Sequence, residues 1–150
     1  MFGTADQGGD VVQQGAYAKS LNALKSRGRS VKMLWQHDPN RPIGVWDEVY
    51  EDKYGLFVKG RILTDIQAGR EAIALVEAGA IDGLSIGYRT VRSEKGAKGG
   101  RNLHELELWE VSLVTFPMLP EARVETHEDV SVIASDLAAV IAEARRELLA

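Results

Sequence analysis

Apolar and polar residues alternate through much of the chain with a period of two, which is the pattern of half-buried β-strands. This alternation predicts five strands, over residues 31–37, 43–50, 56–63, 81–91 and 103–116. The sequence Glu-Asp-Lys-Tyr-Gly at 51–55 predicts a hairpin loop between the second and third strands. Residues 38–42, which include two prolines, predict a turn directly after His37.

Helical periodicity is confined to short segments. Residues 16–24 predict a short helix, and residues 65–78 predict a longer one, capped by Asp65 and ended by Gly79. A polar, glycine-rich stretch at 93–100 predicts a flexible hairpin tip between the last two strands. The elements are therefore mainly β with flanking helices, which favours a compact barrel or sandwich.

The C-terminal part of the chain has a different character. Residues 126–130 form an acidic connector, and residues 131–149 keep the apolar spacing of an amphipathic helix. We therefore predict one domain over residues 1–125, followed by a connector and helix over 126–150. The apolar stripe of this helix fits packing on its own domain and self-association equally well.

Composition narrows the classes of function. Hydrophobic residues make up 45% and charged residues 27% of the 150 residues, as in water-soluble globular proteins. The net charge of −4 argues against nucleic-acid binding, and no apolar run is long enough to span a membrane. The absence of cysteine excludes disulfides and thiol nucleophiles, so a nucleophile has to be an oxygen. The first residues do not form a secretion signal, so we expect the protein to stay where it is made.

One serine stands in a short glycine motif, Gly83-Leu84-Ser85-Ile86-Gly87. The motif fits the nucleophile elbow of α/β-hydrolases, which requires a helix after the serine and a histidine later in the chain. Here the residues after Ser85 favour a strand, and the most suitable histidine precedes it. We therefore reject the α/β-hydrolase interpretation, and the motif alone also fits an ordinary turn.

A serine hydroxyl needs a base within hydrogen-bond reach and a third group that orients this base. Of the three histidines, His37 closes an apolar strand just before a turn, where an imidazole can reach a cleft. His104 and His127 have polar neighbours. A histidine at a strand end is more often structural, so only its combination with Ser85 supports a catalytic role.

Glu110 is a candidate for the third group because it interrupts an apolar strand whose two faces both look buried. An unpaired buried charge costs several kcal/mol, so a glutamate in such a position generally has a partner. An imidazolium would fit, and a salt bridge with an arginine fits equally well. The arginine candidates are Arg61, Arg89 and Arg123.

Several separate motifs stand in order from about Phe2 to Val124. They are Gly9-Asp10-Val11-Val12, Gly15-Ala16-Tyr17, residues 31–38, Pro42-Ile43-Gly44, Gly55-Leu56, residues 81–88, residues 110–115, Pro117 and residues 121–124. Together these motifs resemble the prohead proteases of HK97-type tailed phages, which are related by fold to the herpesvirus capsid maturation proteases.

The resemblance implies that residues 1–125 form a closed antiparallel β-barrel of the herpesvirus-protease type. It also implies that Ser85 and His37 are the catalytic nucleophile and base, with no metal or cofactor. Glu110 looks like the third member. His104 is the competing candidate, since the herpesvirus relatives use a second histidine.

The resemblance further implies a serine endopeptidase that cleaves the scaffold segment of the capsid protein, or a separate scaffold, and its own termini. It would act inside assembling proheads in the host cytoplasm. The expected partner is the major capsid protein or its scaffold segment, with self-association through the 131–149 helix as a further possibility. The alternative is a catalytically silent scaffold module of the prohead that acts through that helix.

Overall fold

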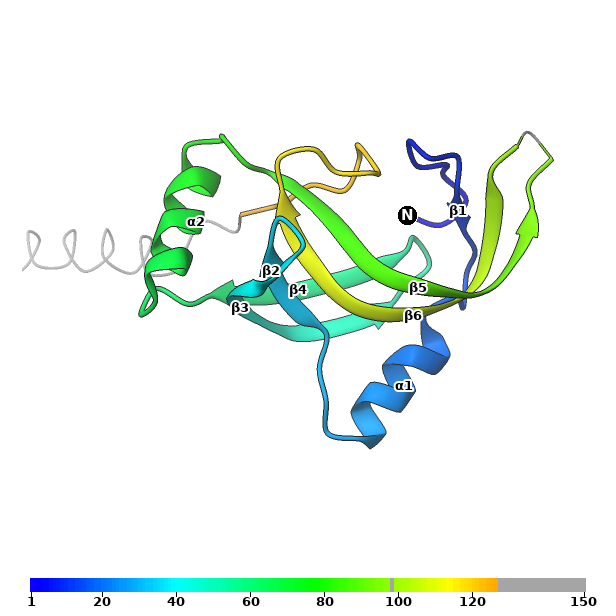
Figure 1. The fold of residues 1–150 in the computed structure, drawn as a ribbon, viewed down its shortest axis with the longest axis horizontal. Helices are drawn as coiled ribbons and strands as arrows, with labels where there is room; N and C mark the ends of the chain where they lie inside the picture. The colour runs from blue at the N-terminus through cyan, green and yellow to red at the C-terminus, as the bar shows by residue number, and fades with distance from the viewer. Residues whose placement is uncertain (98, 127–150) are drawn as a thin grey trace, which may run out of the picture.

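The computed structural model of the protein describes residues 1–97 and 99–126. Their elements, in chain order, are β1 (Val11–Val12), α1 (Ala18–Ser26), β2 (Lys32–Trp35), β3 (Asp38–Glu51), β4 (Leu56–Ile62), α2 (Gln67–Glu77), β5 (Gly83–Lys95) and β6 (Arg101–Val114) (Figure 1). The predicted C-terminal helix at 131–149 lies outside the described residues. None of the helices in the described part of the chain is long and apolar enough to cross a membrane.

The long strand β6 is the centre of a mixed sheet. Strand β5 runs antiparallel to β6 along its whole length and occupies one of its edges. On the other edge, β1 pairs in parallel with the start of β6 and β2 pairs in parallel with its last part. Strands β3 and β4 then follow β2 in antiparallel order (Figure 1). The prediction of a mainly β fold with flanking helices is confirmed.

The sheet is open, so the prediction of a closed antiparallel β-barrel is wrong. Strands β4 and β5 are its two edges, and no pairing joins them in residues 1–97 and 99–126. A cavity of about 1210 Å³ separates them and is lined from both sides, by Val58 and Ile86 among others. The Leu84 N–H, at the start of β5, instead donates to the Ala122 carbonyl at 2.9 Å. The chain after β6, and not β4, therefore pairs with the start of β5, at residues 82–84.

Two groups of apolar side chains form the core on one face of the sheet. The first group packs α1 against β6 through Tyr17, Leu106 and Leu108. The second group packs α2 against the other end of the sheet, with Ala72 of the helix against Ile43. Helix α2 therefore covers the end of the sheet at β3 and β4, the two strands that it contacts (Figure 1).

The turn after β2 is tighter and earlier than the sequence predicts. Strand β2 ends at Trp35 and β3 begins at Asp38, so the turn consists of Gln36 and His37 rather than residues 38–42. Proline fits an extended backbone, and both prolines lie where the β2–β3 ladder is irregular. His37 therefore lies in a turn and does not close a strand.

Other boundaries shift by a few residues. Helix α1 begins and ends two residues later than predicted, at Ala18 and Ser26. Helix α2 begins at Gln67 with Ile66 at its N-cap and no side-chain cap, so the predicted cap by Asp65 is wrong. Strand β5 continues into the predicted flexible tip as far as Lys95, and β6 begins at Arg101, directly after the tip.

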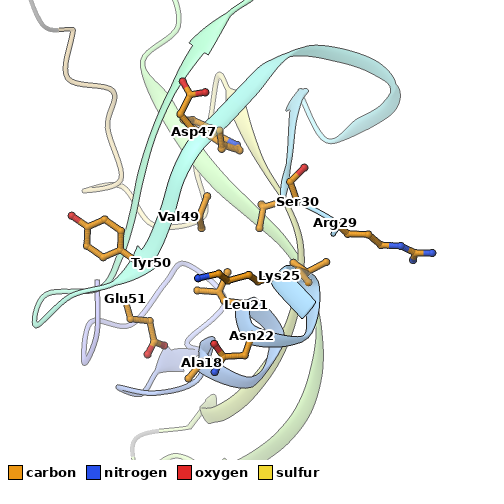
Figure 2. Close-up of a pocket in the computed structure, with 13 residues that line it drawn as sticks. Ala18, Leu21, Asn22, Lys25, Arg29, Ser30, Asp47, Val49, Tyr50 and Glu51 are labelled. Carbon is orange, nitrogen blue, oxygen red and sulfur yellow. The ribbon is translucent and has the colours of Figure 1, made fainter. Parts of the chain in front are cut away.

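A second cavity, of about 510 Å³, lies between α1 and β3 (Figure 2). Lys25 and Arg29 line it together with Asp47 and Glu51, so neither charge dominates. None of the residues that the sequence singled out for catalysis borders this cavity.

An ion pair joins the N-terminal segment to the start of β6, and it yields a test of the fold. Arg101 binds Asp10 through two hydrogen bonds, of 2.5 and 3.1 Å. These bonds are the main reason that the pKa of the Asp10 carboxyl lies below its ordinary value. The pKa of Asp10 is therefore lower in the folded than in the unfolded protein. The stabilisation by this ion pair is complete above the unfolded pKa of about 3.9, and it is lost as the pH falls through the folded pKa.

We predict that Asp10→Asn lowers the free energy of unfolding at pH 7, and that the difference from wild type shrinks as the pH falls below about 4. Urea denaturation at several pH values measures the loss of stability at pH 7 and its dependence on pH. Glu107→Gln is the control, because it removes a more exposed pair with Arg89 and should change stability little. A difference for Asp10→Asn that stays constant down to low pH would contradict the assignment.

Candidate active site

Ser85 lies on the face of β5 that points away from the apolar core. Its neighbours Leu84 and Ile86 pack against the core cluster, so by strand alternation Ser85 and the two motif glycines share the opposite face. A Cβ at Gly83 would collide with Pro117, and a Cβ at Gly87 would collide with the Glu110 carboxylate. The two glycines therefore leave room on either side of the serine, and they do not form an elbow.

One extra residue in β6 turns Glu110 toward this same face. The flanking register pairs are Gly87–Glu110 and Tyr88–Leu108. Trp109 is left without a partner on β5, which makes it a β-bulge. Leu108 before the bulge and Val111 after it both belong to the core, although strict alternation would put them on opposite faces. The bulge reverses the alternation and directs Glu110 away from the core.

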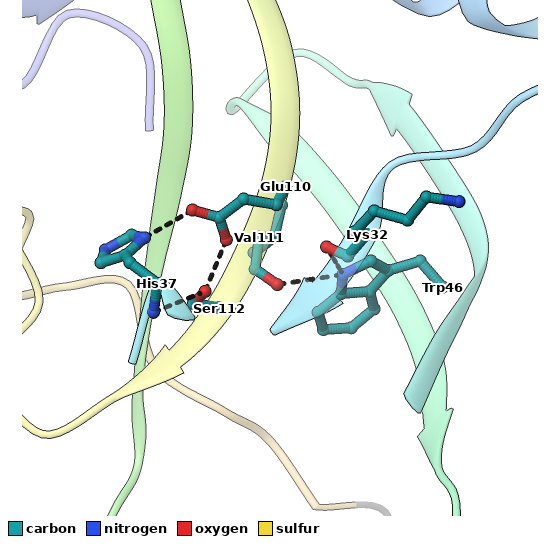
Figure 3. A network of polar contacts seen from close by, with 6 residues as sticks. All are labelled: Lys32, His37, Trp46, Glu110, Val111 and Ser112. Atoms are coloured by element: carbon teal, nitrogen blue, oxygen red, sulfur yellow. Dashed lines mark hydrogen bonds and ion pairs between the residues drawn. The ribbon is translucent and has the colours of Figure 1, made fainter. Parts of the chain in front are cut away.

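The Glu110 carboxylate joins two other side chains (Figure 3). His37 Nδ1 lies 2.5 Å from Glu110 Oε1, and the Ser112 hydroxyl donates to Glu110 Oε2 at 2.5 Å. The Ser112 oxygen also accepts a hydrogen bond of 3.1 Å from the His37 N–H. The Glu110 side chain is 10% exposed and the His37 side chain is 41% exposed. The carboxylate is therefore buried, while the imidazole bound to it is open to solvent.

The His37 turn has an unusual backbone. Gln36 and His37 have φ values of 53° and 61°, in the left-handed region that residues with a Cβ rarely adopt. The Gln36 N–H donates to the Leu113 carbonyl, and its side chain exchanges two hydrogen bonds with Thr115. Such strain persists where surrounding contacts fix it, and it is concentrated at functional sites.

The structure decides between the partners that the sequence left open for Glu110. The three candidate arginines pair elsewhere: Arg61 with Asp47, Arg89 with Glu107 and Arg123 with Asp82. His104 lies at another bulge of β6, and its Nε2 lies 3.4 Å from a Glu94 carboxylate oxygen. Glu110 is therefore the group that contacts His37, and His104 belongs to the hairpin end of the sheet.

Ser85 and Ser112 form a register pair on neighbouring strands, so their side chains lie on the same face. Ser112 is fully buried, and both hydrogen bonds of its hydroxyl are to Glu110 and His37. Ser85 is 7% exposed, and no hydrogen bond joins it to His37 among the described residues. Sequence reasoning missed Ser112. The signal was its spacing of two from Glu110, which puts both on one face of a strand.

No group of three or more histidine, aspartate or glutamate side chains with the geometry of a metal site occurs within residues 1–97 and 99–126. The polar groups that meet on the sheet face of Ser85 are the His37 imidazole, the Glu110 carboxylate and the Ser112 hydroxyl. These groups can move a proton and orient a base.

Comparison with known proteins identifies the family. The family model described as Caudovirus prohead serine protease matches residues 1–135. The chain belongs to the Caudovirus prohead serine protease family. This match covers His37, Ser85 and Glu110 and all of the described strands.

Two curated prohead proteases are similar to this family member. The prohead protease of Enterobacteria phage HK97 is 29% identical over 136 residues, which cover 89% of this chain and 59% of the relative. The prohead protease of Escherichia phage T5 is 31% identical over 113 residues, which cover 75% of this chain and 52% of the relative. The chain thus spans between half and three fifths of the length of these relatives.

A solved structure shares the fold. The bacteriophage T4 capsid assembly protease, gp21, superposes with a TM-score of 0.59 over 77% of each chain, at 16% sequence identity. At this identity the likeness concerns the arrangement of strands and helices only.

The contact between Gly87 and Glu110 gives a test of the site. We predict that Gly87→Ala lowers the free energy of unfolding by about 1–3 kcal/mol, because the added methyl overlaps the buried carboxylate. In a Glu110→Ala background the same substitution should cost much less, since the group that the methyl meets is gone. Chemical denaturation of the wild type, the two single variants and the double variant measures the coupling. Equal costs in both backgrounds would show that the carboxylate does not lie over Gly87.

Proposed function

We propose that this prohead protease family member is a serine endopeptidase with Ser85 as nucleophile, His37 as general base and Glu110 as the group that orients the base. The observation that carries the proposal is the contact of 2.5 Å between His37 Nδ1 and a buried carboxylate, on the sheet face that also carries Ser85. In serine nucleophile sites on unrelated folds, an imidazole that is bound to a carboxylate in this way activates the serine.

The proton transfers follow from the contacts of the imidazole. With its Nδ1–H donating to Glu110, His37 presents an unprotonated Nε2 as the base. The base takes the proton of the Ser85 hydroxyl while the oxygen attacks the peptide carbonyl, and an acyl-enzyme forms as the protonated imidazole gives its proton to the leaving amine. In the second step His37 takes a proton from a water molecule, and this water attacks the acyl-enzyme and releases the acyl group. Glu110 stabilises the imidazolium in both steps.

The distance along β5 supports this assignment. Glu110 Oε1 lies against Gly87, two residues from Ser85 and on the same face. Two residues of a strand span about 7 Å, a gap that an imidazole bound to the carboxylate can bridge. Hydrogen bonds of catalytic bases are often long before a substrate binds and shorten in the complex.

The outer edge of β5 supports an extended peptide as the substrate. The Leu84 N–H already donates to a strand-like segment at Ala122, which shows that this edge accepts an antiparallel partner. By alternation the backbone groups of Ile86 point in the same direction, and Ile86 lines the 1210 Å³ cavity. Proteins often bind extended peptides by adding them as a strand to such an edge.

The relatives suggest the substrate class. Two are named prohead proteases, and the protein with the similar solved structure is named a capsid assembly protease. We infer that this chain cleaves the scaffold segment of the capsid protein, or a separate scaffold protein, and its own chain. It would do so inside assembling proheads in the host cytoplasm.

Replacement of Ser85 gives the direct test. We predict that Ser85→Ala reduces cleavage of a co-expressed capsid protein by about 10³-fold or more while the fold is retained. Ser93→Ala, on the exposed far part of the same strand, is the matched control and should cleave like wild type. Mass spectrometry of the products measures the processing.

Retained processing in Ser85→Ala would exclude Ser85 as the nucleophile. A wild type that neither cleaves the capsid protein nor reacts with a serine-directed phosphonate would favour the alternative, a silent scaffold module acting through the predicted 131–149 helix.

A further inference from the structure

The Ser112 hydroxyl lies at the junction of the candidate site. It donates to Glu110 Oε2 at 2.5 Å and accepts from the main-chain N–H of His37 at 3.1 Å (Figure 3). A serine hydroxyl has a single proton to donate, and in this position the proton is committed to the carboxylate. One oxygen atom therefore connects the backbone of the proposed base to the side chain that orients it.

Both groups that Ser112 contacts need to be held in place. The His37 backbone is left-handed, a conformation that is unfavourable for a residue with a Cβ. Its N–H is fixed by the Ser112 oxygen, whereas the neighbouring Gln36 is fixed by Leu113 and Thr115. Loss of the Ser112 oxygen would thus free the histidine itself and leave the rest of the turn anchored.

The carboxylate is constrained from its other side. Glu110 Oε1 receives His37 Nδ1, and Oε2 receives the Ser112 proton, so within the described residues each oxygen has one partner and the plane of the carboxylate is set. Without the hydroxyl, Oε2 would be buried without a donor, which is unfavourable, and the carboxylate could rotate to seek another. Rotation would move Oε1 away from the imidazole.

We propose that Ser112 is a positioning residue of the active site: its hydroxyl holds the Glu110 carboxylate and the His37 backbone in register, so that the imidazole faces Ser85 in the tautomer that accepts a proton. This inference rests on the proposed function. Ser112 is not itself a nucleophile, because it is fully buried and its hydroxyl is engaged on both sides.

The pair Ser112→Thr and Ser112→Val provides the test. The two side chains have nearly the same volume and branching and differ in the hydroxyl. The first readout is the second-order rate at which a fluorophosphonate probe labels Ser85. We expect Ser112→Val to be labelled about 10- to 100-fold more slowly than Ser112→Thr, by analogy with the loss of a hydrogen-bonding group that orients a metal ligand.

The second readout reports positioning without any reaction. In ¹⁵N-labelled protein the imidazole nitrogen shifts of His37 show which nitrogen carries the proton. The proposal expects the Nδ1–H form in wild type and Ser112→Thr, and a mixture of both tautomers in Ser112→Val. Ser112→Ala removes the oxygen without adding bulk, so it should behave like Ser112→Val even if the extra methyl disturbs both larger variants.

The outcomes separate this inference from the proposed function. Equal labelling of the Thr and Val variants, together with an unchanged His37 tautomer in Ser112→Ala, overturns the positioning role and leaves the serine protease proposal intact. Wild type that is not labelled at Ser85 contradicts the proposed function, and the tautomer measurement then still decides whether Ser112 positions His37.

Discussion

A carboxylate buried against a sheet needs a partner for each of its oxygens, and the arrangement around Glu110 follows from this requirement. Leaving such a charge unpaired would cost several kcal/mol. The imidazole of His37 occupies one oxygen and the hydroxyl of Ser112 occupies the other. The imidazole comes from the tight turn between β2 and β3, so burial of the carboxylate also fixes where that turn lies on β6. The site is therefore assembled by electrostatics, on the face of the sheet that does not carry the core.

The backbone makes this arrangement sterically feasible through two local departures from a regular strand pair. The bulge at Trp109 reverses the alternation of β6, and without it residue 110 would point into the core. Gly87 on the neighbouring strand lacks the Cβ that would occupy the place of the carboxylate. The glycine motif around Ser85 thus has a different physical meaning from that of a nucleophile elbow, because its glycines allow close approach rather than a strained turn.

The sequence predicted the parts of the fold that depend on local periodicity. All the long strands and both described helices lie within a few residues of the predicted segments, because burial on one face imposes a period of two or 3.6. Closure of the sheet was mispredicted from the family resemblance, and periodicity could not correct it, because periodicity shows which face is buried and does not show which edges pair. The turn at residues 36–37 was missed because its left-handed backbone is held by distant partners such as Thr115. The sequence left the partner of Glu110 open between an imidazole and an arginine, and the structure shows the contact with His37.

The most direct test of this account is the experimental structure of the protein after reaction with a peptide phosphonate. The account predicts phosphorus bonded to the Oγ of Ser85, with His37 Nε2 within hydrogen-bonding distance of the adduct and Nδ1 still on Glu110. Phosphorus on any other residue, or an imidazole turned away from residue 85 in the adduct, would contradict it.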